Sequence, residues 1–500
     1  MERLKLFIDG QYVESKSSEY TPVYNPSTGE QIAEVPACTK EEVEMAIAAA
    51  HKAFPAWSST PVSKRVQVLF KFRELLEENM DDLTYTLCRE NGKNWDEGQG
   101  DLLKVKEPVE VACGAPNLMM GEALMNVTSG FDTTWYREPL GVFVGIAPFN
   151  FPAMIPMGWM MPMCIATGNT LILKVSPITP MTSLKMVAML KEAGLPDGVV
   201  NVIVAQPEES EILLKHPDVR GVTFVGSTKV GQHIYATAAA HGKRVQALCQ
   251  AKNHALVLED APLERTAAGI INSSFGCAGE RCMALPVVVV QESIADDLIA
   301  EIMRQVKEHK IGCAYDKETN LGPIVSPTQY ERVMKWIEKG VEEGADLILD
   351  GRGVKVPGFE KGFFIGHTIF DNVTPDMSIG QIEIFWPVLS IKRVKDFEEG
   401  LALMNANPYA NGSVIFTQNG AYAREFALRT HAGMVGVNVG IPVPAGMFAF
   451  GGHKLSIFGD LHVLGKDGMR FYTESKAVTT RWFDAEESKK STVSTWDGAM

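Results

Sequence analysis

A cysteine that directly follows an arginine is the most reactive pairing in this chain. Residues 275–283 read Phe-Gly-Cys-Ala-Gly-Glu-Arg-Cys-Met and place Cys282 after Arg281, in a glycine-containing turn before the apolar run 287–290. A thiolate is a strong nucleophile near neutral pH. A neighbouring guanidinium lowers the pKa of a thiol and can hold an anionic substrate. The alternative is a buried structural cysteine, so the prediction of a nucleophile depends on other motifs.

A second motif supplies a hydrogen-bond donor. Residues 148–152 read Pro-Phe-Asn-Phe-Pro and lie between an expected strand and an expected helix. The side-chain amide of Asn150 could donate to a developing oxyanion, and the flanking prolines restrict the backbone that aims it. A structural turn asparagine is the alternative.

Three further positions could hold a phosphate-bearing or ribose-bearing cofactor. Residues 226–231, Gly-Ser-Thr-Lys-Val-Gly, follow a strand and open a helix, where backbone N–H groups can approach a pyrophosphate. Lys174 ends another strand at the rim of the same expected sheet, and Glu383 could bind ribose hydroxyls. An ordinary turn, a surface lysine and a solvated carboxylate are the respective alternatives.

Alternating strands and helices position these residues. The pattern predicts strands at 142–146, 170–174, 200–204 and 221–225, with helices at 154–166, 181–193, 210–215 and 229–240. Such alternation indicates a parallel sheet covered by helices. A second alternating block follows residue 260. Thr39 is a predicted N-cap for a helix over 39–54, and residues 470–482 are expected to form a strand before a polar, frayed end at 484–500.

Composition narrows the class of protein. A length of 500 residues indicates two or three domains. The net charge of −14 argues against nucleic acid or an anionic membrane as a partner. Eight scattered cysteines without a C-x-x-C pair indicate a reducing compartment and no zinc site. The most apolar window, 151–165, is shorter than a membrane span and contains three prolines. No secretory or mitochondrial signal is evident, so we expect a cytoplasmic location.

Taken together, these motifs resemble the aldehyde dehydrogenase superfamily, from residue 7 to residue 482. Within it the chain is most similar to the CoA-acylating branch of methylmalonate-semialdehyde (malonate-semialdehyde) dehydrogenases. The motifs that carry the closer match are Pro-Phe-Asn-Phe-Pro-Ala-Met-Ile-Pro (148–156), Arg-Val-Gln (244–246), Ala-Lys-Asn-His (251–254), Arg-Cys-Met-Ala (281–284), Ile-Pro-Val-Pro (441–444), Phe-Gly-Asp-Leu (458–461), Gly-Lys-Asp-Gly (465–468) and Arg-Phe-Tyr-Thr (470–473).

The resemblance implies an α/β fold with three parts. A Rossmann-like cofactor domain would cover 1–128 and 147–258, and an α/β catalytic domain would cover 259–469. A small β oligomerisation arm with a C-terminal tail would cover 129–146 and 470–500. It also implies a homodimer or homotetramer.

The resemblance also implies roles for individual residues. Cys282 would attack the aldehyde to form a thiohemiacetal, with Asn150 and the Cys282 backbone N–H as the oxyanion hole. Hydride transfer to NAD would then leave a thioester. Arg281 and Lys104 would hold a substrate carboxylate. The cofactor contacts would be Ala147, Phe149, Lys174, Gly226, Ser227, Gly231, Glu383 and Phe385, with no metal.

The residue expected to decide the fate of the thioester is Leu248. Hydrolytic members of the superfamily carry a glutamate base four residues before the lysine that matches Lys252. With leucine at that place, water attacks slowly and the thiol of CoA is the better acceptor, which predicts acetyl-CoA or propionyl-CoA as product. A hydrolytic NAD(P)-dependent enzyme with another base such as Glu280 is the nearest alternative, and a non-catalytic relative is the other.

Several positions depart from the family pattern. Gln250 and Trp386 each replace a glycine near the cofactor; bulk at the first could block the site, and a positive φ at the second would strain tryptophan. Pro177 replaces a glutamate that reaches the adenosine ribose, so NADP is possible although NAD is favoured. Cys249 could compete as a second thiol. His453 and Lys104 suggest an altered aldehyde.

Overall fold

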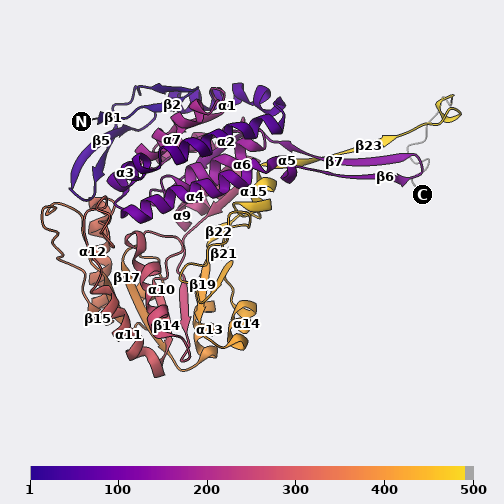
Figure 1. Cartoon of the computed structure of the whole chain (residues 1–500). Helices are drawn as coiled ribbons and strands as arrows, with labels where there is room; N and C mark the ends of the chain where they lie inside the picture. The colour runs from indigo at the N-terminus through magenta and orange to yellow at the C-terminus, as the bar shows by residue number, and fades with distance from the viewer. Residues whose placement is uncertain (1, 490–500) are drawn as a thin grey trace.

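The structure is a computed structural model that describes residues 2–489. Two lobes, each built on a β-sheet, pack against one another, and a narrow arm projects from the first lobe (Figure 1). The expected frayed end therefore lies partly outside the described residues, at 490–500. Among residues 2–489, no helix combines the length and the apolar character needed to cross a bilayer.

The first lobe contains an eight-stranded sheet with a parallel centre. Its strands in spatial order are β22 (Ile457–Phe458), β12 (Arg244–Leu248), β11 (Val219–Val225), β8 (Val142–Ile146), β9 (Thr170–Lys174), β10 (Val200–Ile203), β2 (Leu6–Ile8) and β3 (Gln11–Val13). The five strands from β12 to β10 run parallel, and antiparallel strands add to both edges. The expected parallel sheet is thus confirmed.

Helices cover this sheet. They include α1 (Lys40–Ser59), α2 (Val62–Glu78), α3 (Met80–Asn91), α4 (Trp95–Cys113), α6 (Met161–Ala166), α7 (Met181–Glu192), α8 (Pro207–Lys215) and α9 (Thr228–Ala240). A three-stranded sheet of β1 (Glu2–Arg3), β5 (Glu30–Pro36) and β4 (Tyr20–Asn25) adds to the same lobe.

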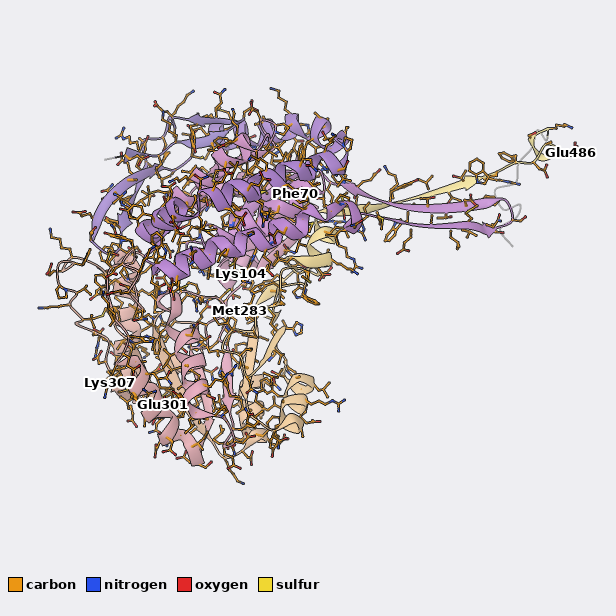
Figure 2. All side chains as sticks on the ribbon, in the orientation of Figure 1. Phe70, Lys104, Met283, Glu301, Lys307 and Glu486 are labelled. Atoms are coloured by element: carbon orange, nitrogen blue, oxygen red, sulfur yellow. The ribbon has the colours of Figure 1, made fainter. Side chains whose placement is uncertain are left out.

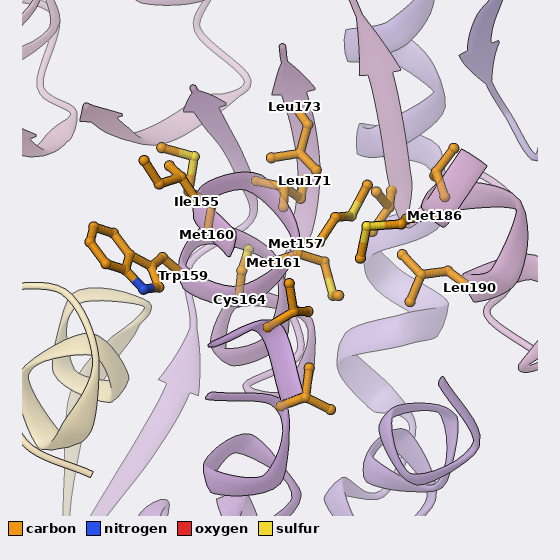
Figure 3. Packing of buried hydrophobic residues seen from close by; sticks show 14 of the residues in the cluster. Ile155, Met157, Trp159, Met160, Met161, Cys164, Leu171, Leu173, Met186 and Leu190 are labelled. Atoms are coloured by element: carbon orange, nitrogen blue, oxygen red, sulfur yellow. The ribbon is translucent and has the colours of Figure 1, made fainter. Parts of the chain in front are cut away.

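The methionine-rich window lies in the core beneath this sheet. It forms a π-helix, η1 (Met154–Met160), that continues into α6. Met157, Met160 and Met161 are buried and pack with Leu171 and Leu173 of β9 (Figure 3). The window is a core helix, as its length indicated. Proline removes a backbone donor from a helix, which is consistent with the wider turn at its start.

The second lobe contains a seven-stranded sheet. Its order is β15 (Asp346–Leu349), β16 (Thr368–Asp371), β17 (Val388–Val394), β14 (Val287–Gln291), β13 (His254–Val257), β19 (Gly412–Phe416) and β20 (Met434–Val437). Its helices are α10 (Leu263–Phe275), α11 (Glu292–Val306), α12 (Pro327–Glu342), α13 (Phe397–Ala406) and α14 (Gly420–Arg429). Five of the six strand pairs are parallel; only β15 runs antiparallel to its neighbour.

The arm is a three-stranded antiparallel sheet of β6 (Glu122–Thr128), β7 (Phe131–Pro139) and β23 (Thr473–Arg481). Figure 2 shows side chains on both faces of this single layer. The arm differs from the expected range 129–146, because it begins earlier with β6 and because β8 pairs inside the eight-stranded sheet. All five residues of β8 are buried, as befits a central parallel strand. Residues 470–471 also differ from expectation, since they end helix α15 (Gly465–Phe471).

Candidate active site

A cavity of about 150 Å³ lies where the two lobes meet. It brings together seven predicted residues: Phe149, Asn150, Gly226, Ser227, Cys282, Glu383 and Phe385. The departures Cys249, Gln250 and Trp386 also line it, as do Gln329 and Arg332 of α12, which sequence reasoning missed. The volume is below the ~300–1,000 Å³ typical of ligand pockets, because side chains of both lobes fill part of the space.

Cys282 follows a tight turn that ends α10. The 3-10 segment η2 (Gly276–Gly279) has Cys277 and Ala278 in the left-handed region, at φ of 52° and 51°. Two side-chain amides hold the Cys282 carbonyl, from Asn253 at 2.9 Å and from Asn411 at 3.1 Å. Both asparagines were missed as supports of the site, although Asn253 belongs to the quoted motif 251–254. They fix the backbone from which the thiol projects.

The Cys282 thiol is protonated at rest. Burial, and then the nearby carboxylate of Glu383, raise its pKa to about 12, while Arg281 and Lys93 lower it by less. Arg281 therefore does not produce the strongly activated thiolate that the sequence suggested. Deprotonation of the Cys282 thiol therefore requires a change in the groups that surround it.

Asn150 is buried beside the cysteine turn. Its Nδ2 donates to the carbonyl of Glu280 at 2.9 Å, and its own carbonyl accepts from Lys93 Nζ at 2.6 Å. An amide nitrogen carries two hydrogens, so this contact leaves one for a ligand.

Arg281 and Lys104, which were predicted to hold a substrate carboxylate, do not line the cavity that contains Cys282. Arg281 turns the other way: its Nε donates to Cys277 Sγ at 3.2 Å, and its Nη2 lies 3.5 Å from Glu97. Its guanidinium lies across Gly276, where a Cβ would be 2.4 Å from Nη1. Arg281 lines a separate cavity of about 360 Å³. Lys104 is half-exposed on α4 and pairs with Glu107 at 2.8 Å (Figure 2).

The cofactor side of the site is only partly as predicted. Lys174 ends β9, where its carbonyl accepts from the Ala147 N–H at 3.0 Å, and neither residue lines the cavity. Burial lowers the pKa of Lys174. Gly231 is a packing glycine, since a Cβ there would lie 2.3 Å from Cys249 Sγ. Cys249 is thus held against α9, and burial raises its pKa to about 12.

Gln250 spans the cavity. Its Oε1 accepts from the Thr228 N–H at 3.2 Å, in the first turn of α9, and its side chain lies beside the Glu383 carboxyl, whose pKa it lowers. Glu383 Oε1 accepts from the Ala251 N–H at 3.1 Å, and burial raises the pKa of this carboxyl to about 7. Gln250 thus occupies one group expected to meet the cofactor, the Thr228 N–H, and lies beside another, Glu383.

A nicotinamide dinucleotide fits the remaining groups. Ser227 begins the 13-residue helix α9 without a capping bond from its side chain, which leaves helix N–H groups for a phosphate. Gln329 Oε1 is buried without a hydrogen-bond partner among the described residues, and Arg332 lies in the same cavity. An unsatisfied acceptor and a cation suit a ligand with hydroxyl and phosphate groups.

Trp386 is not strained in the way the sequence suggested. The positive φ, 71°, falls on Phe385. Trp386 is buried, and Gly279, at φ of 73°, lies so close that a Cβ would be 2.3 Å from the Trp386 carbonyl oxygen. The tryptophan therefore fills space behind the cysteine turn.

Neither expected base position holds a free carboxylate. Leu248 is 4% exposed and belongs to the apolar core of the first lobe. Glu280 is buried and its Oε1 accepts from the Val325 N–H at 3.2 Å, away from Asn150. Burial raises the pKa of Glu280 well above its usual value, and its Oε1 is already engaged by the Val325 N–H.

Comparisons with known proteins agree with this geometry. A model of the aldehyde dehydrogenase family matches residues 12–478. Malonate-semialdehyde dehydrogenase 1 of Geobacillus thermodenitrificans is 48% identical over 483 residues, covering 96% of this chain and 99% of that protein. The solved methylmalonate-semialdehyde dehydrogenase of Oceanimonas doudoroffii is 43% identical with a TM-score of 0.95, covering 98% and 100%. A Sinorhizobium meliloti protein assigned to the same activity and complexed with NAD is 42% identical, with a TM-score of 0.95 and coverage of 97% and 99%. The chain belongs to the aldehyde dehydrogenase family.

Proposed function

We propose that this enzyme oxidises a small carboxylated aldehyde, such as malonate or methylmalonate semialdehyde, with NAD and passes the acyl group to CoA. The observation that carries the proposal is the pairing of Cys282 and Asn150 in one cavity while a buried leucine occupies the hydrolytic base position. Similarity to malonate-semialdehyde dehydrogenases over nearly the whole chain supports the same substrate class.

The proposed chemistry begins at the Cys282 sulfur. Its thiolate adds to the aldehyde carbon, and Asn150 Nδ2 donates to the resulting oxyanion. The bound nicotinamide supplies the hydride acceptor. Loss of hydride leaves a thioester on Cys282, which the CoA thiolate attacks as Cys282 leaves. Loss of CO₂ with uptake of a proton converts a malonyl-type group into acetyl-CoA or propionyl-CoA.

Residues of this chain would hold the cofactor. The Ser227 end of α9 and Lys174 would meet the phosphates and the adenosine ribose. Glu383 would accept hydrogen bonds from the nicotinamide ribose. Those bonds would reduce the electrostatic effect by which the Glu383 carboxylate raises the pKa of Cys282. Cofactor binding would therefore favour the thiolate. Gln250 must release Glu383 and Thr228 for this to occur.

Water is the second candidate acceptor. Glu383 lies in the cavity of Cys282, and its pKa of about 7 suits a general base. A hydrolytic reaction would then give a free acid without CoA.

The test is reduction of NAD or NADP with malonate semialdehyde, in the presence and absence of CoA, with the product identified. Turnover that needs CoA and yields acetyl-CoA supports the proposal, and free acid without CoA supports hydrolysis. The proposal fails if Cys282→Ala leaves oxidation unchanged. Cofactor binding is measured by the quenching of tryptophan fluorescence. If neither NAD nor NADP binds, the protein is a non-catalytic relative.

The proposal also includes a cellular location and an oligomeric state. The eight free cysteines fit a reducing compartment such as the cytoplasm. The projecting arm fits a homodimer or homotetramer.

A further inference from the structure

A buried ion pair lies directly behind the Asn150 loop. Lys93 Nζ is 2.7 Å from Asp101 Oδ2, and the two side chains are 1% and 0% exposed. Removing two charges from water is costly, and mutual attraction offsets the cost only when other hydrogen bonds satisfy the pair. The partners of this pair therefore show which segment it serves.

Those partners belong to the segment that carries Asn150. Lys93 Nζ donates to the Asn150 carbonyl at 2.6 Å and lies 3.5 Å from the centre of the Phe151 ring. Asp101 Oδ1 accepts from the Met154 N–H at 2.7 Å. One ion pair thus holds both ends of residues 150–154.

The contacts continue to the cysteine turn. Asn150 Nδ2 donates to the Glu280 carbonyl, two residues before Cys282. The Lys93 charge also lowers the pKa values of Cys282, Cys277 and Glu280 in the turn, and of Cys88 in α3. Asp101 of α4 is the charged group in direct contact with the Lys93 ammonium.

We propose that Lys93 and Asp101 are positioning residues that set the Asn150 amide against the reacting carbon on Cys282 and place a positive charge behind the thiol. This inference rests on the proposed roles of Cys282 and Asn150. A pair that served only folding would affect stability but leave the chemistry of folded protein unchanged.

A double-mutant cycle tests the link to Asn150. We expect Lys93→Met to lower kcat at least tenfold with little change in KM, because an oxyanion donor contributes about 10²–10³ in kcat. In an Asn150→Ala background the same change should lower kcat less than about threefold, because coupled residues are not additive. Lys106→Met is the matched control: this lysine lies on α4, the helix that carries Asp101, and pairs with Glu77 at the surface, and its loss should leave kcat unchanged.

Alkylation of Cys282 by iodoacetamide gives a readout without turnover. Lys93→Met should raise the pKa of Cys282 and move the alkylation profile to higher pH, as followed by mass spectrometry of the Cys282 peptide. If the wild-type protein oxidises no aldehyde but Lys93→Met still shifts the alkylation profile of Cys282, the proposed function is wrong and the role of Lys93 stands. Full additivity in the cycle, or wild-type kcat and alkylation in Lys93→Met, overturns the inference. If that variant does not fold, Asp101→Asn decides, since it keeps an acceptor for Met154 and should still lower kcat.

Discussion

At the scale of single residues, Cys282 and Glu383 make opposing demands on one cavity. A carboxylate beside a thiol disfavours the thiolate, and burial of both groups strengthens this effect. The pKa values of about 12 for Cys282 and about 7 for Glu383 place the thiol at rest in its neutral form. Burial is the larger cause of the raised pKa of Cys282, and neutralising Glu383 removes only the second cause.

Glu383→Gln should lower the pKa of Cys282. The substitution removes a negative charge that raises the pKa of this thiol, so the thiolate fraction rises at any given pH. We expect iodoacetamide to modify Cys282 several-fold faster at pH 8, since each pKa unit changes the thiolate fraction about tenfold. Glu301→Gln, on the surface of α11, is the control (Figure 2). An unchanged rate at Cys282 would contradict the assigned effect of Glu383.

Gln250→Gly should strengthen cofactor binding. The glutamine amide occupies the Thr228 N–H and lies beside Glu383, and its removal opens both groups to the ligand. We expect Kd for NAD to fall about tenfold, measured by calorimetry. Gln250→Glu should act in the opposite direction, because it adds a second negative charge beside Glu383. Weaker binding in Gln250→Gly would show instead that the side chain contacts the cofactor.

At the scale of elements, helix ends are set by local hydrogen bonds. The predicted N-cap Thr39 is confirmed: its side chain accepts from the Glu42 N–H, and Glu42 accepts from the Thr39 N–H at 2.9 Å, which completes a capping box. The helix runs to Ser59 and includes Pro55, whereas the predicted helix ended at residue 54. Glu42 also accepts from Ser15, so this cap ties α1 to the N-terminal segment.

Thr39→Ala should loosen the start of α1. Loss of an N-cap costs about 1 kcal/mol, which corresponds to roughly fivefold faster amide exchange where opening is local. Hydrogen exchange with mass spectrometry would measure this in the peptide that covers the first turns. Helix α12, which has its own cap at Ser326, is an internal control and should not change. Equal acceleration in both helices would indicate global rather than local destabilisation.

At the scale of the whole molecule, the arm is too thin to bury its own apolar side chains. Leu124 and Met125 of β6 are 63% and 76% exposed, and Tyr136 of β7 and Val478 of β23 are also exposed. Exposed apolar side chains gathered on one projecting element are typical of an interaction surface. We expect the arms of neighbouring copies to cover one another's apolar faces or those of the lobes.

Leu124→Asp with Met125→Asp should shift the proposed dimer or tetramer toward a smaller assembly. Burying two unpaired charges at an interface is unfavourable. Light scattering coupled to size exclusion would report the mass. Leu428→Asp, an equally exposed position on α14 outside the arm, serves as the control. An unchanged mass in the double variant would place the interface elsewhere.

Features that depend on near neighbours could be predicted from the sequence. Strand and helix alternation, the Thr39 cap and the turn around Cys282 all follow from periodicity and residue type, and the family resemblance predicted that Asn150, Ser227, Glu383 and Cys282 would meet. The direction of Arg281 could not be predicted in this way, because Glu97 and Asn272, which are distant in sequence or on another element, bind its guanidinium.

Tertiary contacts likewise placed β8 in the large sheet, turned Glu280 toward Val325 and stretched Gln250 between Glu383 and α9. They also joined Lys93 to the Asn150 loop across 57 residues of chain. These outcomes depend on partners distant in sequence. Residue type predicts that a buried polar group must find a partner, whereas the packing of the two lobes decides which partner it finds.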